Sequence, residues 1–522
     1  MNHKITRTGA ERPTESGTAI LNRLDGYSRQ LKEYRCNERL QYEGVDTLEA
    51  LKLHLYPVLL SQCRAQGSTG SQQIDFRLFK HGLLSYFREI LFLSGRLWDR
   101  VGARVFSSDI GPKKVLFWPC EPTHVNAQMP VSRALTALGI ENGFITSRPW
   151  IHNYLSRAGY DVLFLDKHFG KEIDRGKNNW EKRRAGFDFE YQETDEFGPP
   201  PWDPEQAMGA MKKRMVQLMP LVFQTVDIFQ GILAQMSPSV LVVGNDISYE
   251  GRTACLAARN YGLPTVSLMH GAISGNPVHA CHIADRFLVY GESSKKTLAQ
   301  LDDNPSRFVA CGAPYLDKRP RQTGKINSVL CKRIQLHSKQ PYVLVATSGP
   351  GVSVSYFHHL LVIKNLMRLS MKYKEINFIA KLHRKDRLEY YEKCFEEVPG
   401  SRLKVIEYGA KGYPVDIFHW LQGCSCLITG ASSVAMEAML MDVPVITLDF
   451  CEEFECVDFI DKDTTIHVSE PTELDRYFEH PDAIANAFSK RKPNIDAYLK
   501  ASFFDLDGKS SLRCAKEICD LI

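Results

Sequence analysis

Short apolar runs alternate with helix-length segments through most of this chain. Apolar runs at 113–118, 141–147 and 161–165 are separated by stretches with helical spacing of apolar residues, ending at Gly139 and Gly159. This order predicts a βαβαβ unit with parallel strands and right-handed connections. A charged, proline-rich insertion at 170–205 is predicted to be a surface loop. The alternation then resumes with a long helix over about 206–235 and four more apolar runs, at 239–246, 265–271, 286–291 and 307–314.

A polar segment at 317–328 separates this unit from a second one, whose strands are predicted at 341–349, 376–383, 403–409, 425–430 and 443–450. Two doubly wound units of about 150–200 residues each predict an α/β protein with two Rossmann-like domains. We expect the first domain at 111–317, the second at 329–500 and a C-terminal helix at 501–522.

The first 110 residues are predicted to form a helical region outside both domains. Leu84, Phe87 and Leu91 recur at helical spacing, with Arg88 and Arg96 among the basic residues between the apolar positions. A basic amphipathic helix can pack on a neighbouring domain or lie on an anionic membrane surface. The sequence leaves both arrangements open.

The charge balance argues against a dedicated nucleic-acid binder, because 65 basic and 61 acidic residues give a net charge of only +4. The fourteen cysteines have no zinc-site spacing, which predicts free thiols in a reducing compartment. The polar N-terminus lacks a signal core, and the apolar runs are too short to span a bilayer. We therefore expect a cytoplasmic protein, at most peripheral to a membrane.

Ligands of doubly wound sheets bind beyond the carboxyl ends of the strands, so the residues that follow each apolar run are candidates for chemistry. Asp246 and Glu250 follow the run at 239–244 and are candidates for a general base or nucleophile. Asp246 could equally cap the next helix. His270 is the third catalytic candidate. Candidates for acceptor binding, expected on the loop after the first strand, are Glu121, His124 and Asn126.

The segment 427–446, LITGASSVAMEAMLMDVPVI, is the most informative part of the second domain. A strand ends at Gly430, and Ser432 or Ser433 is placed to cap the helix that follows. Free N–H groups at a helix N-terminus can hold a phosphate without a metal. Glu437 lies one turn further, where it could reach a ribose hydroxyl. The alternative is an ordinary capping serine and a solvated glutamate.

Two other strand ends of the second domain carry candidates for donor binding. Lys381, His383 and Arg384 in KLHRKD would make a cationic pocket suited to a monophosphate or diphosphate. Thr347 and Ser348 begin the glycine-rich segment TSGPG, which matches neither a P-loop nor a dinucleotide fingerprint.

The order of these segments resembles the GT-B glycosyltransferases of bacterial capsule and lipopolysaccharide assembly, of the Kdo- and sialyltransferase kind. The likeness is carried by LMHGA (268–272), FVACGAPYLD (308–317), KLHRKD (381–386) and the stretch 416–446. In family members that use CMP-sugars, a His-Pro pair and a Ser-Ser pair bind the nucleotide. Ser432 and Ser433 match the second pair, whereas His383 is followed by Arg384 in place of proline.

The resemblance implies transfer of a sugar, expected to be a CMP-linked acidic sugar such as Kdo or sialic acid, to a glycan or lipid-linked acceptor. It implies no metal and no cofactor other than the nucleotide sugar, which is the substrate. Similar serine-rich turns occur in UDP-GlcNAc 2-epimerases and CDP-glycerol glycerophosphotransferases, so both activities are alternatives. A non-catalytic scaffold in a polysaccharide assembly complex is a third.

Overall fold

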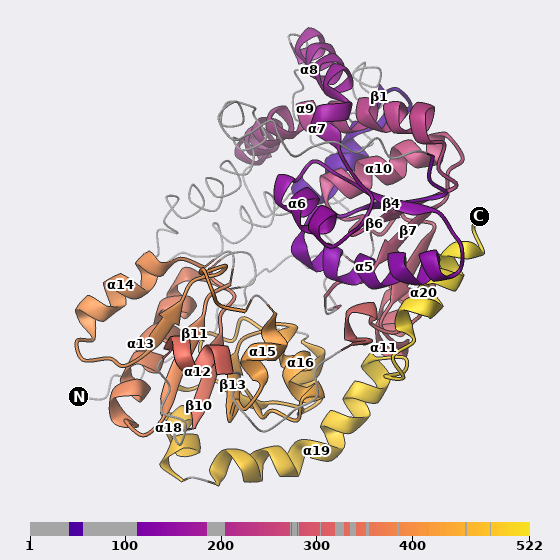
Figure 1. Ribbon diagram of the computed structural model, residues 1–522. Helices are drawn as coiled ribbons and strands as arrows, with labels where there is room; N and C mark the ends of the chain where they lie inside the picture. Colours follow the sequence, from indigo (N-terminus) through magenta and orange to yellow (C-terminus); the bar gives the residue numbers. More distant parts are fainter. Residues whose placement is uncertain are drawn as a thin grey trace.

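Two parallel α/β sheets, one after the other in the sequence, form the two domains of the protein (Figure 1). The computed structural model describes residues 41–55, 112–184, 204–271, 281–302, 304–318, 328–334, 341–350, 354–383, 386–414, 416–454, 457–480 and 482–522, with Ile273 and His279. The amphipathic segment around Phe87, Arg384, and most of the linker predicted at 317–328 lie outside the described residues.

The first sheet has seven parallel strands in the order β5-β4-β3-β6-β7-β8-β9. Strand order reverses between β3 and β6, which makes their carboxyl ends the switch point where doubly wound sheets bind ligands. Every strand predicted for this domain is present: β3 (Val115–Trp118), β4 (Asn142–Thr146), β5 (Val162–Phe164), β6 (Val240–Val243), β7 (Thr265–Leu268), β8 (Arg286–Val289) and β9 (Phe308–Ala310).

The helices of this domain differ from the prediction in two places. The helix after β3 begins at Pro122, nine residues earlier than the apolar pattern suggested, so α5 takes in the expected loop. Residues 170–184 form helix α8 where a surface loop was predicted. Its sequence is mostly charged, but Trp180 and Gly176 face inward and are buried against α9. The helices are α5 (Pro122–Ala137), α6 (Pro149–Arg157), α7 (Leu165–His168), α8 (Gly170–Arg184), α9 (Pro204–Met236), α10 (Tyr249–Asn260) and α11 (Glu292–Ala299).

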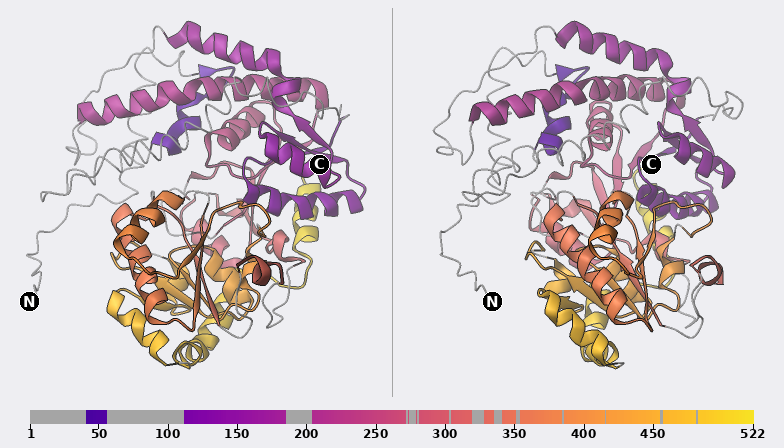
Figure 2. Two further views of the ribbon diagram at one scale, coloured as in Figure 1. Left: turned by 60° about the vertical axis from the view of Figure 1, so that its left-hand side comes forward. Right: turned by 90° about the vertical axis from the view of Figure 1, so that its left-hand side faces the viewer.

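Helix α9 is, among the described helices, the one long and apolar enough to cross a membrane, and 61% of its most apolar window is buried inside the protein. Phe223 stacks on Tyr42 at 3.9 Å between ring centroids, and Met215 and Leu218 are fully buried. Packing within the first domain therefore accounts for its apolar sequence. Figure 2 shows α9 running beside α8 in this domain.

Residues 41–55 belong to the core of the first domain. They form a hairpin of β1 (Gln41–Tyr42) and β2 (Val45–Asp46), followed by helical residues at 47–55. The hydroxyl of Tyr42 donates to Asp227 at 2.7 Å, and Glu49 forms an ion pair with the buried Arg252. This part of the predicted N-terminal region thus includes strands as well as helix.

The second sheet has six parallel strands in the order β12-β11-β10-β13-β14-β15, with its switch point between β10 and β13. Its strands are β10 (Tyr342–Ala346), β11 (Asn377–Lys381), β12 (Lys404–Ile406), β13 (Cys426–Thr429), β14 (Val445–Leu448) and the unpredicted β15 (Ile466–Val468). The helices are α12 (Ser328–Ile334), α13 (Tyr356–Lys372), α14 (Leu388–Glu397), α15 (Ile417–Leu421), α16 (Val434–Leu440), α17 (Asp458–Asp461) and α18 (Pro471–Glu479).

The C-terminal segment returns from the second domain to the first. Helix α19 (Ala483–Ser502) leads away from the second domain, and α20 (Ser510–Cys519) packs beside α5 (Figures 1 and 2). Cys514, Ala515 and Ile518 are buried in the same apolar cluster as residues of β3 and β6. The single helix predicted at 501–522 is therefore the end of α19 followed by a separate helix that completes the first domain.

Candidate functional site

The carboxyl-end edges of the two sheets meet where the domains are in contact. Tyr315 lies in the short 3-10 helix η5 (Pro314–Leu316) that follows β9, and its hydroxyl is 3.4 Å from Oε1 of Glu437 in α16. Met269, just after β7, shares a buried apolar cluster with Met436 of the same helix. Residues that follow the strands of the first sheet are thus held beside the helix that begins after β13.

A pair of histidines occupies the switch point of the first sheet. The rings of His124 and His270 are 4.5 Å apart and nearly perpendicular, and the N–H of Cys120 donates to Nδ1 of His124 at 3.2 Å. Gly244, after β6, makes this possible, because a Cβ there would lie 2.2 Å from the His124 ring. Burial lowers the pKa of His270, which favours the neutral form of its imidazole.

Two of the three acceptor candidates, His124 and Asn126, lie in helix α5 and not on a loop. Glu121 is the residue before α5, and His124 lies in the first turn of that helix. Burial lowers the pKa of His270, and the negative charge of Glu121 partly offsets this decrease. Glu121 therefore lies near the histidine pair. Asn126 is exposed on α5 and does not share this burial.

Asp246 is completely buried, and its carboxylate is occupied within the protein. Oδ1 lies 2.7 Å from Nδ1 of His282, while Oδ2 accepts the N–H groups of Ile283 and Ala284 at 2.7 and 2.9 Å. The cap of α10 is Ser248, so Asp246 has neither the exposure expected of a base nor the capping role. It fastens the end of β6 to the segment that enters β8.

Glu250, in the first turn of α10, is paired with a cation that the sequence did not single out. Its Oε1 lies 2.8 Å from Nη2 of Arg148 and accepts a longer bond of 3.3 Å from the hydroxyl of Tyr249. Arg148 lies two residues after the end of β4, so its position near a strand end was the available signal. The opposite charges of Arg148 and Glu250 therefore compensate each other near the carboxyl ends of the strands in the first sheet.

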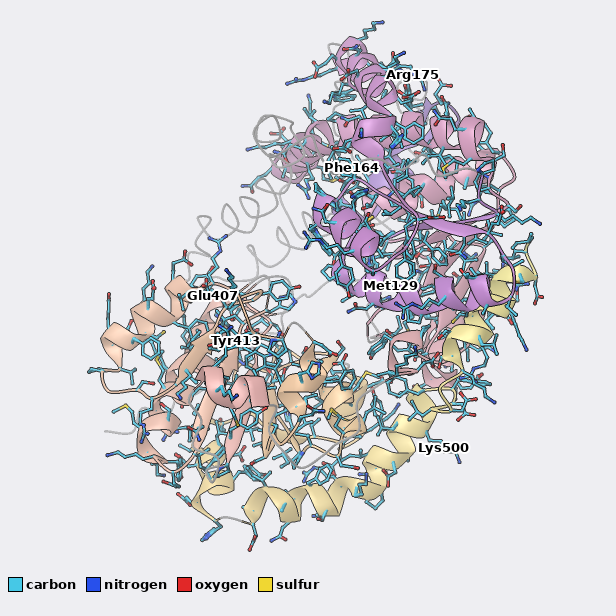
Figure 3. The ribbon with its side chains drawn as sticks, viewed as in Figure 1. Met129, Phe164, Arg175, Glu407, Tyr413 and Lys500 are labelled. Atoms are coloured by element: carbon cyan, nitrogen blue, oxygen red, sulfur yellow. The ribbon has the colours of Figure 1, made fainter. Side chains whose placement is uncertain are left out.

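On the second domain, Lys381 and Glu437 form a group with Asp416. Burial lowers the pKa of Lys381, and the charges of Asp416 and Glu437 oppose that effect. Burial raises the pKa of Glu437 to about 8. Among the described residues, its Oε2 atom is buried without a hydrogen-bond partner. Glu407 and Tyr413 mark the neighbouring loop between β12 and α15 (Figure 3).

The ends of β10 and β11 are tied together beside this group. Oγ1 of Thr347 accepts the N–H of His383 at 3.1 Å. The buried Asp386 accepts a hydrogen bond of 2.9 Å from the hydroxyl of Tyr391 and lies 3.0 Å from Nε2 of His359. Asp386, the last residue of KLHRKD, is therefore held by side chains of α13 and α14.

A small pocket of about 40 Å³, partly open to solvent, lies at the switch point of the second sheet. Three predicted donor residues line it, namely Thr347, Ser348 and Gly430, and Lys381, His383, Ser432 and Ser433 lie outside its lining. Ser432 accepts a long bond of 3.5 Å from the N–H of Val434, and the side chain of Ser433 does not cap α16.

No known family model matches the chain, and no curated protein matches its sequence. Among solved structures, MnaA of S. aureus, determined with UDP, superposes with a TM-score of 0.50 at 13% identity, over 78% of this chain and 98% of its own. The chain has a GT-B-type fold. A UDP-N-acetylglucosamine 2-epimerase is similar with a TM-score of 0.49 at 13% identity, covering 78% of this chain and 95% of its own. The wall teichoic acid polymerase TagF superposes with a TM-score of 0.42 at 11% identity, over 79% of this chain and 89% of its own.

Proposed function

We propose that the protein transfers a sugar from a nucleotide donor to a hydroxyl group of a glycan or lipid-linked acceptor in surface polysaccharide synthesis. The observation that carries the proposal is the meeting of the two strand-end edges at Tyr315 and Glu437. Met269, which precedes His270 in the chain, also shares a buried apolar cluster with Met436, which precedes Glu437. The reaction would take place in the cytoplasm, with a lipid-linked acceptor presented at the inner face of the membrane.

The second domain would hold the donor. Lys381, His383 and the Ser432–Ser433 pair offer a positive charge and hydroxyl groups for phosphate, and Arg384 would add a second charge. Oε2 of Glu437 is buried and lacks a hydrogen-bond partner among the described residues, and a ribose hydroxyl would supply one. The resemblance of the serine pair to CMP-sugar enzymes makes a CMP-linked acidic sugar the proposed donor.

The first domain would supply the base. The neutral His270 would take the proton of the acceptor hydroxyl as its oxygen attacks the anomeric carbon. The bond between that carbon and the phosphate oxygen would break, and the nucleotide would leave with the electron pair. His124 packs against His270 and would fix its orientation. Asp246 and Glu250 would act by holding their own neighbours, His282 and Arg148, in place.

Thermal shifts with CMP, CDP, UDP and GDP test the donor site. A ligand at a hundredfold excess over its Kd stabilises the folded protein by about 2.7 kcal/mol. We expect CMP to raise the melting temperature most, and the Ser432→Ala/Ser433→Ala variant to lose that shift. Ser425→Ala, exposed at the opposite end of β13, is the matched control.

The outcomes separate the alternatives. A dominant shift with UDP, together with conversion of UDP-GlcNAc in the absence of any acceptor, would replace transfer by epimerisation. A dominant shift with CDP and turnover of CDP-glycerol would indicate glycerophosphotransfer. If no nucleotide shifts the melting temperature, the donor site is wrong and a binding scaffold is the better account.

A further inference from the structure

A hydroxyl group from the first domain contacts the carboxyl group that we assign to the donor site in the second. The Tyr315 hydroxyl lies 3.4 Å from Oε1 of Glu437, and the two residues are 122 positions apart. Burial raises the pKa of Tyr315 well above its usual range, and the charge of Glu437 raises it further. The phenol therefore keeps its proton and donates to the carboxyl oxygen.

Tyr315 is held firmly on the first domain. Two residues further on, the carboxylate of Asp317 accepts the N–H groups of Ser510 and Ser511 at 3.0 and 2.8 Å, at the start of α20. The Tyr315 ring also lies 5.8 Å from that of Tyr290, between centroids. Its hydroxyl thus has a fixed position from which to orient a group on the opposite domain.

The other oxygen of the same carboxyl group has no use within the described part of the protein. Oε2 of Glu437 is buried and lacks a hydrogen-bond partner there, although Lys381 and Asp416 lie near enough to influence its charge. A buried polar atom without a partner is unfavourable, so a ligand hydroxyl at this point would gain a hydrogen bond that the described part of the protein does not supply.

We propose that Tyr315 is a positioning residue for the donor. It holds Oε1 of Glu437 so that Oε2 forms a hydrogen bond with a ribose hydroxyl of the nucleotide. This inference rests on the proposed function and adds to it that the first domain takes part in donor recognition. Donor binding and the contact between the domains are consequently coupled, because the same carboxyl group serves both.

The test compares the binding of ribonucleotides and their 2′,3′-dideoxy forms by calorimetry. The ligands are CMP and UMP, each against its dideoxy analogue, and the proteins are the wild type and Tyr315→Phe. Loss of one orienting hydrogen bond should weaken ribonucleotide binding about three- to tenfold. Binding of the dideoxy form should not change, because that ligand has no ribose hydroxyl that can form a hydrogen bond with Oε2.

Tyr290→Phe is the matched control, since it removes a hydroxyl from the same aromatic cluster and leaves the Tyr315–Glu437 contact intact. It should keep the wild-type preference for ribose. In a Glu437→Gln background, Tyr315→Phe should produce a smaller additional loss than in the wild type, as expected for two residues acting through one contact.

Each contrary result has a distinct meaning. Equal weakening of ribose and dideoxy forms by Tyr315→Phe would show a packing role and overturn the inference, as would an unchanged ribose preference. Both results leave the proposed function standing, because the wild type still binds nucleotide. If the wild type binds neither CMP nor UMP, the proposed function fails and this inference fails with it.

Discussion

Nδ1 of His282 lies 2.7 Å from Oδ1 of Asp246 in the interior of the first domain. The second carboxylate oxygen accepts two backbone N–H groups, from Ile283 and Ala284. Arg307 donates to the carbonyl of His282 at 3.0 Å and so adds a further support to the same segment. One buried side chain therefore joins the switch point of the first sheet to the start of β8.

Replacing Asp246 should destabilise the first domain. Removing one partner of a buried ion pair costs about 3–5 kcal/mol, so Asp246→Ala should show a loss of that order in denaturant unfolding. Asp246→Asn should lose less, because its amide oxygen can still accept the backbone N–H groups. Wild-type unfolding with complete loss of turnover in Asp246→Ala would instead support the direct catalytic role that the sequence suggested.

The same pair predicts a dependence on pH. Burial opposes ionisation of Asp246, but His282 and the two N–H groups more than compensate and hold its pKa well below the usual range. This stabilisation is present above about pH 4, the unfolded value, and is lost as the pH falls through the folded pKa. The stability difference between wild type and Asp246→Asn should therefore stay constant near neutrality and narrow in acid, as followed by unfolding at several pH values.

Gly244→Ala should disrupt the histidine pair. The added Cβ would lie 2.2 Å from the His124 ring, so His124 must move away from its contact with His270. Overpacking of this kind costs about 1–3 kcal/mol, and transfer activity should fall with it. Gly209→Ala is the control, because it lies exposed on α9 with open space around its Cα and should be slightly stabilising. Normal activity in Gly244→Ala would show that the pair is not needed.

The strands of both sheets could be predicted because parallel strands buried on both faces leave continuous apolar runs. The prediction missed β15, which has only three residues and an exposed His467 at its centre. Helix α8 was missed because Trp180 and Gly176 are its only buried positions in a charged sequence. The sequence also did not predict which domain α20 packs against, because an apolar stripe on a helix does not specify the surface that covers it.

The candidate residues could be placed at strand ends from the sequence, but their contacts could not be predicted. Asp246, His270 and Glu437 were selected because they follow strands, and the partners of two of them come from distant parts of the chain. His282 is 36 residues from Asp246, and Tyr315 is 122 residues from Glu437. Whether a strand-end carboxylate faces a ligand or an internal partner depends on such long-range contacts, which spacing along the sequence does not encode.

Helix α20 provides a test of the domain assignment. Ile518 is fully buried against the first sheet, so Ile518→Ala should destabilise that domain by about 2–5 kcal/mol. Hydrogen exchange should become faster in peptides that contain β3 and β6. Leu512→Ala, on the same helix but 36% exposed, should have little effect. Faster exchange confined to the strands of the second sheet would contradict the placement of α20.

Glu437→Gln should change how the stability of the protein depends on pH. Burial raises the pKa of Glu437 to about 8, so the folded protein retains a proton that the unfolded chain releases at a much lower pH. The wild type should lose stability between about pH 4.5 and 8 for this reason, whereas glutamine cannot ionise. The melting temperature of Glu437→Gln relative to the wild type should therefore rise across that interval and level off above it. Glu396→Gln, exposed on α14, should melt with the wild type throughout. If the melting temperatures of Glu437→Gln and the wild type differ by the same amount at every pH, the carboxyl group is already ionised near neutrality. Tyr315 would then orient a carboxylate, and nucleotide affinity should show no change through pH 8.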